Sequence, residues 1–210
     1  MTIIKPRLFC FFISFFLLAA LDSRPAAIAQ TDNPHADTDT GKRRISLNEL
    51  AFGTGYIRGT LDHGSRDHAV YPAFVRIGFT LNPLFGIRSE RASLQLALEP
   101  FLNPVSSETD GVEAGIGIGL RYRHKLSLPL DIYIEGSIAP MYLGIDTGEQ
   151  GAGGFNFLDQ AGAGLQYRIT KTNALFGGYR FRHISHAGTM DRSNDGINSH
   201  ALVLGVSWLY

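Results

Sequence analysis

"VEAGIGIGLRY", residues 112–122, alternates strictly between two kinds of side chain. One set is apolar and consists of Val112, Ala114, Ile116, Ile118, Leu120 and Tyr122. The other set is small or charged and consists of Glu113, Gly115, Gly117, Gly119 and Arg121. A period of two predicts a β-strand with one apolar and one polar face. The stretch therefore predicts a sheet that separates an apolar environment from a polar one.

The same alternation recurs along most of the chain, and almost no segment shows the spacing of an amphipathic helix. Eight segments carry it, at about 45–58, 75–81, 93–99, 112–122, 131–138, 160–169, 173–186 and 198–210. Eight is an even number and the smallest common size of a membrane barrel. The fold class that we predict is all-β, an eight-stranded antiparallel transmembrane β-barrel. A soluble barrel with its aliphatic face turned inward fits the alternation equally well.

The N-terminal segment favours export. Lys5 and Arg7 precede an apolar run at 8–21, and Ala27-Ile28-Ala29 forms a small-x-small cleavage site. These features predict a signal peptide at 1–29. Residues 30–44 are polar and without periodicity, so we expect a flexible lead-in followed by a barrel domain at 45–210.

The C-terminus favours the membrane over the soluble alternative. "HALVLGVSWLY", residues 200–210, ends on an aromatic residue and sets its apolar side chains on one face. It resembles the terminal strand by which outer-membrane proteins are recognised for assembly. We therefore expect outer-membrane lipid and the barrel assembly machinery as partners.

Composition excludes two other classes of function. Lysine plus arginine and aspartate plus glutamate each number 19, and no basic face is concentrated enough for nucleic acid. The single cysteine, Cys10, lies in the predicted signal peptide, so the exported chain has no disulfide and no thiol chemistry.

The lengths of the connections orient the predicted barrel. Short turns and a moderate connection are typical of the periplasmic side, and long polar loops of the external side. The first group comprises 125–128, 170–172 and 82–92, and the second comprises 59–68, 99–111, 142–154 and 187–197. The strand at 173–186 then runs outward and ends at the outer leaflet.

Near that end, polar side chains occupy the apolar face. His183 and Ser185 share the parity of lipid-facing residues, whereas Arg180 and Arg182 have the inward parity. Asn198, on the outward face of the next strand, is expected to lie close to them. Polar groups against hydrocarbon cost free energy unless they are paired, so their presence suits a lipid substrate. A serine becomes a nucleophile when a base such as histidine accepts its proton.

"RHISHAGTMDRSNDGINS", residues 182–199, resembles the signature of the lipid A 3-O-deacylases (the PagL family, acyloxyacyl hydrolases). These are eight-stranded outer-membrane enzymes that remove the ester-linked 3-hydroxyacyl chain at position 3 of lipid A. The resemblance implies a carboxylic ester hydrolase of the Gram-negative outer membrane. Its substrate would be the lipid A of lipopolysaccharide, and no cofactor is implied.

The resemblance also implies roles for individual residues. Ser185 would be the nucleophile and His183 the general base. Asn194 matches a family asparagine associated with the oxyanion, and His186 stands where the family usually has asparagine, so we assign both to oxyanion stabilisation or positioning.

One departure concerns the acid that orients the histidine. The family has a glutamate near the position where this chain has Asn198, in a loop that is one residue longer here. An amide oxygen can accept the histidine N–H but cannot compensate imidazolium charge, which predicts weakened activity. Asp195, or Asp191, in the adjoining loop is a candidate substitute acid.

The same residues admit three other interpretations. His183, His186 and His200 differ in parity and lack a carboxylate cluster, so we predict no metal site. Inward charges are expected to fill a narrow barrel as salt bridges rather than to form an acid–base site; they are Glu113, Arg121, Glu135, Arg168 and Arg180. The alternative function is a non-catalytic small outer-membrane barrel, of adhesin or structural type, that retains the family scaffold.

Overall fold

The computed structural model describes residues 45–61, 67–107, 109–127 and 129–210. The predicted signal peptide (1–29) and lead-in (30–44) lie outside the described residues. Within them, the elements in chain order are β1 (Leu47–Thr60), β2 (Asp67–Val70), β3 (Ala73–Thr80), α2 (Asn82–Phe85), β4 (Ala92–Ser106), β5 (Gly111–Ser127), β6 (Leu130–Leu143), β7 (Gly154–Arg168), β8 (Asn173–Ser185) and β9 (Ile197–Leu209).

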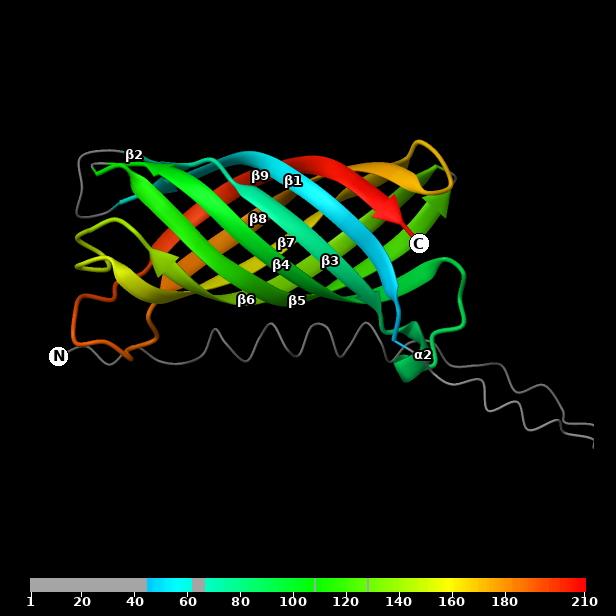
Figure 1. Cartoon of the computed structure of the whole chain (residues 1–210), viewed down its shortest axis with the longest axis horizontal. Helices are drawn as coiled ribbons and strands as arrows, with labels where there is room; N and C mark the ends of the chain where they lie inside the picture. The colour runs from blue at the N-terminus through cyan, green and yellow to red at the C-terminus, as the bar shows by residue number, and fades with distance from the viewer. Residues whose placement is uncertain (1–44, 62–66, 108, 128) are drawn as a thin grey trace, which may run out of the picture. The chain divides into compact units, whose positions relative to one another are not determined.

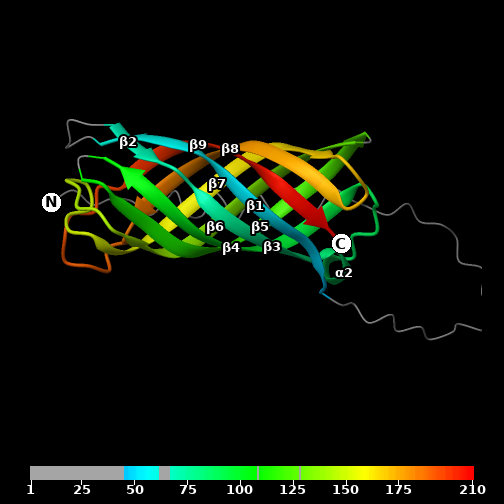
Figure 2. The same cartoon turned by 45° about the horizontal axis from the view of Figure 1, so that its top comes forward.

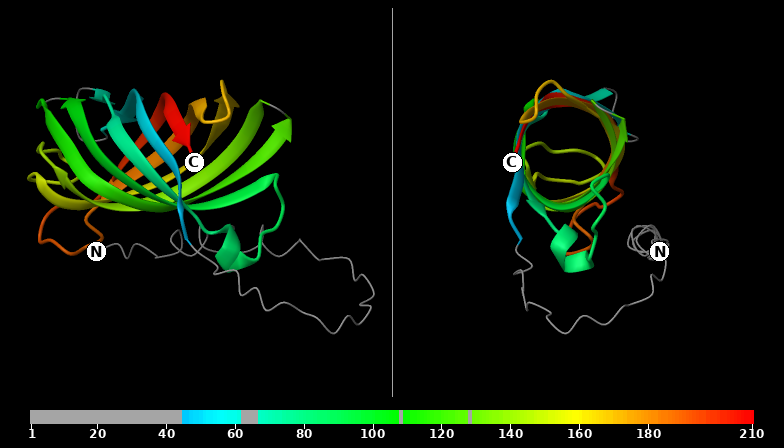
Figure 3. Two further views of the ribbon diagram at one scale, coloured as in Figure 1. Left: turned by 45° about the vertical axis from the view of Figure 1, so that its right-hand side comes forward. Right: turned by 90° about the vertical axis from the view of Figure 1, so that its right-hand side faces the viewer.

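The strands form one antiparallel sheet that closes on itself (Figures 1 and 3). Strands that follow one another in the chain pair, except β2 with β3, and β1 pairs with β9 from Glu49↔Leu209 to Gly59↔Ser199. β2 and β3 both lie between β1 and β4, so they are two parts of one strand position. The eight-stranded barrel predicted from the alternation is confirmed.

The interruption between β2 and β3 is caused by Pro72. Proline has no N–H to donate to the ladder. On either side of it, the N–H of Tyr71 donates to the carbonyl oxygen of Pro104 (2.9 Å) and the N–H of Ala73 donates to Oδ1 of Asn103 (3.2 Å). A side-chain amide thus takes the place of a backbone acceptor, and the strand continues across the break.

Two connections are shorter than expected. The prediction of a long loop at 99–111 is wrong, because β4 runs to Ser106 and only 107–110 connect it to β5. Pro100 and Pro104 resemble strand breakers, yet they stand opposite Ile116 and Val112 in the ladder. The expected connection 59–68 is also shorter, because Thr60 pairs with Asp67.

The two ends of the barrel differ. The C-terminus, the start of β1, α2 and the turn at 169–172 lie at one end (Figures 1 and 2). The long connections 144–153 and 186–196 lie at the other, which we call the loop end. This division matches the predicted grouping of short and long connections. None of the helices described in the structure is long and apolar enough to cross a membrane.

Apolar side chains cover the outside of the barrel. Those exposed on the outer face include Ile116, Ile118, Leu165, Leu175, Leu202 and Leu204. Residues of the opposite parity, such as Glu113, Arg121, Arg180 and Arg182, are buried. The aliphatic face therefore points outward, as in a membrane barrel, and the inverted arrangement of a soluble barrel is excluded.

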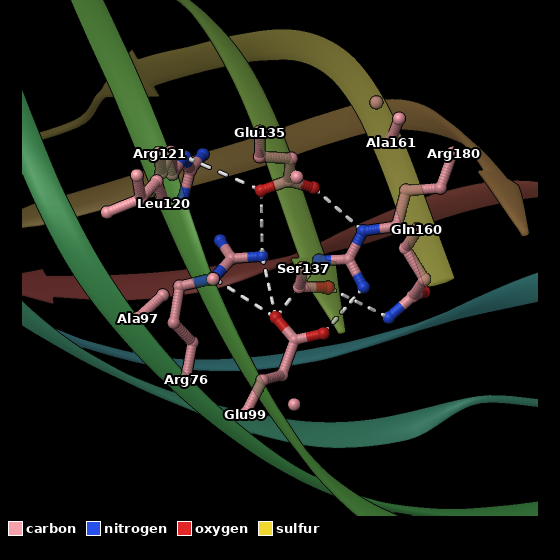
Figure 4. A pocket seen from close by; sticks show the side chains of 14 residues that line it. Arg76, Ala97, Glu99, Leu120, Arg121, Glu135, Ser137, Gln160, Ala161 and Arg180 are labelled. Atoms are coloured by element: carbon pink, nitrogen blue, oxygen red, sulfur yellow. Dashed lines mark hydrogen bonds and ion pairs between the residues drawn. The ribbon is translucent and has the colours of Figure 1, made fainter. Parts of the chain in front are cut away.

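A network of charges from β3, β4, β5, β6 and β8 occupies the lumen (Figure 4). Glu99 accepts from Arg76 Nη2 at 2.9 Å and from Arg180 Nη1 at 2.6 Å. Glu135 lies 3.2 Å from Arg76 Nη2 and 2.7 Å from Arg180 Nε, and 3.8 Å from Arg121 Nε. The two carboxylates and three guanidinium groups thus form the interior salt bridges that the sequence predicts.

Further groups extend this packing toward both ends. Near the loop end, Arg182 Nη2 lies 2.6 Å from Glu113, which also accepts from Asn103 Nδ2 at 3.1 Å. Toward the other end, Arg121 lies 3.7 Å above the ring of Tyr133. That ring fits only because Gly164 and Gly178 have no Cβ: a methyl group on either would come within 2.4 Å of the Tyr133 hydroxyl.

Candidate functional site

β8 presents His183 and Ser185 on the outer surface of the barrel, next to the loop end. Their neighbours in the chain, Arg182, Ile184 and His186, are between 0 and 1% exposed. His183 and Ser185 themselves are only half-buried. The outward orientation predicted from parity is therefore observed. Successive residues on one face of a strand are about 7 Å apart, so the two side chains are neighbours.

Asn198, on β9, stands directly opposite His183 in the ladder. Nδ1 of His183 lies 2.8 Å from Oδ1 of Asn198. An amide oxygen only accepts, so in this pair Nδ1–H is the donor. In the neutral imidazole this tautomer leaves the lone pair on Nε2, which is the arrangement that a general base needs.

The backbone of Gly196 packs against the same imidazole. Its φ is +84°, a left-handed conformation that glycine adopts without strain. A Cβ at this position would lie 2.5 Å from Cε1 of His183. The absence of a side chain therefore lets the backbone of the loop pack against the histidine ring and, together with Asn198, fix its direction.

The connection 186–196 is held by His186 and Asn194. Oδ1 of Asn194 accepts the backbone N–H of His186 at 2.9 Å. Nε2 of His186 donates to the carbonyl oxygen of Ser193 at 3.0 Å, while Nδ1 accepts from the N–H of Met190 at 3.4 Å. His186 is 1% exposed. Both residues therefore position the loop that follows Ser185.

The structure places the predicted substitute acids on the surface of this loop. Asp195 and Asp191 are both exposed. The backbone N–H of Asp195 donates to the carbonyl oxygen of Glu149 at 2.8 Å, which joins the two long connections of the loop end. The role of either aspartate as an acid stays a prediction.

Sequence reasoning missed Asp159 of β7. In the ladder it stands directly opposite His183, on the flank away from Asn198. Asp159 is half-buried on the same outer face. The sequence does predict the outward orientation of Asp159, because position 159 continues the alternating set Ala161, Ala163 and Leu165. The sequence does not predict its alignment with His183, because the register of the two strands depends on the turn between β7 and β8.

The histidines considered for a metal site are dispersed. His186 is buried in the loop, and Nδ1 of His200 bonds the hydroxyl of Tyr179 at 2.6 Å. Over the part of the chain that the structure covers, no three histidine, cysteine, aspartate or glutamate residues gather closely enough to hold a metal ion.

A closed antiparallel barrel with an aliphatic exterior and a charged lumen is the fold of outer-membrane β-barrel proteins. Residues 73–207 match the model of a family described as lipid A 3-O-deacylase (PagL), and the chain belongs to this family. The predicted family is therefore confirmed. No curated protein matches the chain.

Two solved structures show the same fold. The outer-membrane enzyme PagL is 17% identical with a TM-score of 0.56, and the match covers 75% of this chain and 97% of that one. Neisserial surface protein A is also 17% identical, with a TM-score of 0.55, and the match covers 77% of this chain and 96% of that one. At this identity the likeness concerns the fold alone.

Proposed function

We propose that the protein is an outer-membrane esterase that removes the 3-O-linked 3-hydroxyacyl chain from lipid A. Ser185 is the nucleophile and His183 the general base. The observation that carries the proposal is the 2.8 Å contact between His183 Nδ1 and Asn198 Oδ1 on the outer face of the barrel. It supports the neutral tautomer that a serine nucleophile requires of its base. Membership of the deacylase family supplies the substrate class.

The reaction proceeds in two steps. Nε2 of His183 accepts the Ser185 hydroxyl proton while Oγ attacks the ester carbonyl carbon and forms a tetrahedral oxyanion. Its collapse breaks the bond to the sugar oxygen, which takes the proton from His183 and leaves an acyl-serine. Water, deprotonated by His183, then attacks the acyl group, and the fatty acid departs as Ser185 regains its proton.

A hydrogen-bond donor for the oxyanion is present at the loop end. Asn194 uses Oδ1 to hold the backbone of His186, and its Nδ2 makes no hydrogen bond with any residue in the described ranges. That amide group is the donor we assign to the developing negative charge. His186 acts through the loop, because both of its ring nitrogens are engaged there.

The outward position of the site suits a substrate embedded in the membrane. Lipid A reaches His183 and Ser185 laterally from the outer leaflet, without entering the lumen, which is filled by ion pairs. The terminal strand β9 ends near aromatic Trp208 and Tyr210, which fits insertion by the barrel assembly machinery. We assign the protein to the outer membrane of a Gram-negative bacterium.

The test uses purified barrel in detergent mixed with lipopolysaccharide. The expected result is release of a 3-hydroxy fatty acid, detected by mass spectrometry together with the lighter lipid A. Ser185→Ala removes the attacking oxygen and is expected to reduce release at least 10³-fold, as loss of a serine nucleophile does elsewhere. Ser127→Ala, at the opposite end of the barrel, is the matched control.

Unchanged release in Ser185→Ala would refute the assignment of the nucleophile. A folded wild-type protein that leaves lipid A intact, both in vitro and after overexpression, would instead favour the alternative of a non-catalytic barrel. The fold likeness to Neisserial surface protein A, a surface protein by its name, keeps that alternative relevant.

A further inference from the structure

Asp159 is an ionisable residue on the outer surface of a membrane barrel. Its face of β7 continues as Ala161, Ala163 and Leu165, and the latter two are exposed. A carboxylate on the lipid-facing side of a barrel costs free energy, less near the rim than at the midplane. An ionisable group in such a place therefore points to a function and to a specific partner.

The partner that the fold offers is His183. Residues directly opposite in an antiparallel pair have Cβ atoms about 5 Å apart, and Asp159 stands in this relation to His183. The carboxylate makes no hydrogen bond or ion pair with any residue that the structure describes, and the residue opposite it on β8 is His183. Asp159 is therefore not a member of a structural ion-pair network.

The imidazole has two different flanks. On the β9 side, Asn198 accepts its Nδ1–H and Gly196 packs against Cε1. On the β7 side, Asp159 provides a negative charge. Direction of the ring and compensation of its charge, which one carboxylate performs in a Ser-His-Asp triad, are thus divided between residues of two neighbouring strands.

We propose that Asp159 is a positioning residue that stabilises the imidazolium form of His183 during ester cleavage and so replaces the charge that Asn198 lacks. This inference rests on the proposed function. When His183 takes the proton of Ser185, its new positive charge lies beside the Asp159 carboxylate. No bond to Asp159 forms or breaks, and its proton count is unchanged throughout.

The first experiment measures fatty-acid release from lipopolysaccharide by wild type and Asp159→Asn, which keeps the size of the side chain and removes the charge. The expected loss in kcat is about 10- to 100-fold, between the small effect of a solvated charge and the roughly 10⁴ of a buried triad acid. KM should stay within about twofold, because the charge acts only after proton transfer. Asp110→Asn, an exposed aspartate of another loop-end connection, is the matched control and should retain wild-type rates.

The second experiment repeats the substitution in an Asn198→Glu background. With a carboxylate on the β9 flank, the imidazolium has a counter-charge without Asp159, so Asp159→Asn should then cost less than about threefold. A purely structural role for Asp159 would give the same loss in both backgrounds. Heat-modifiable migration on gels establishes that each variant is a folded barrel.

The outcomes separate the two proposals. An active wild type with an unaffected Asp159→Asn, or with equal losses in the two backgrounds, overturns the role of Asp159 and leaves the esterase intact. A folded but inactive wild type overturns the proposed function itself, and the role of Asp159 with it.

Discussion

The lumen and the outer face of the barrel use the same kinds of polar residue in opposite ways. In the lumen, Arg76, Arg180, Glu99 and Glu135 satisfy one another at 2.6 to 3.2 Å. On the outer face, Asp159 stands beside His183 without an ion pair of its own among the described residues. Charges in the lumen are paired with opposite charges of the protein itself, whereas Asp159 has no such partner among the described residues.

The difference shows how a polar residue in a barrel can be assigned. Interior charges in a narrow barrel are enclosed by protein, so they must pair, and their pairing stabilises the fold. A charge on the exterior faces hydrocarbon, which costs free energy. Such a charge is therefore found mainly where it contributes to binding a ligand or to catalysis. β8 carries both kinds, with Arg180 and Arg182 inside and His183 and Ser185 outside.

The largest effect is expected from breaking the lumen network. Glu99→Ala leaves Arg76 and Arg180 to share the carboxylate of Glu135 with Arg121, and an unpaired buried charge typically costs about 3–5 kcal/mol. Unfolding in denaturant, followed by the fluorescence of Trp208, the single tryptophan, measures the loss. Glu90→Ala, at an exposed position between α2 and β4, should change stability by less than about 0.5 kcal/mol. Equal stability of the two variants would contradict a structural role for the network.

A smaller effect, confined to activity, is expected at the outer site. Gly196→Ala forces a side chain to within 2.5 Å of the His183 ring at a φ of +84°. Displacing the base should lower fatty-acid release about 100-fold while the barrel still folds. Gly188→Ala is the control, because its φ is also positive, at +72°, but nothing lies within 4 Å of the added Cβ. If both variants lose activity equally, backbone strain and not the ring contact is responsible.

The smallest effect that we expect is a gain in esterase activity. Asn198→Glu adds a charge beside His183 Nδ1, and we expect release to be preserved or raised by up to about tenfold, because Asp159 already supplies part of the compensation. Asn198→Gln lengthens the side chain without the charge and should not raise the rate. A large loss in Asn198→Glu would show that Asn198 has another role than accepting the histidine N–H.

Much of this arrangement follows from the alternation of side chains alone. Parity predicted the barrel, the inward Arg182 and the outward His183 and Ser185, because a period of two assigns each residue to a face. The pairing of His183 with Asn198 was also within reach, since both strands flank one connection. Asp159 and His183 both lie far along their strands from the turn at 169–172. Their alignment depends on the exact register that this turn sets, which parity does not give, so it could not be read from the sequence.

Local composition misled in one region. The stretch 99–111 was predicted as a loop, yet β4 runs through Pro100 and Pro104 to Ser106, and Pro72 lies between β2 and β3. The ladder tolerates them because acceptors remain usable at each point, among them the carbonyl oxygen of Pro104 and the side chain of Asn103. Such compensation depends on a neighbouring strand and leaves no signal in the segment that contains the proline.

Placement of His183 and Ser185 on the convex wall has a kinetic consequence for the proposed esterase. Encounters with substrate take place by two-dimensional diffusion in the leaflet, so the relevant concentration is the mole fraction of lipid A among its neighbours. Diluting lipopolysaccharide with inert phospholipid at constant bulk concentration should therefore slow turnover. A lumenal enzyme fed from solution would not respond in this way.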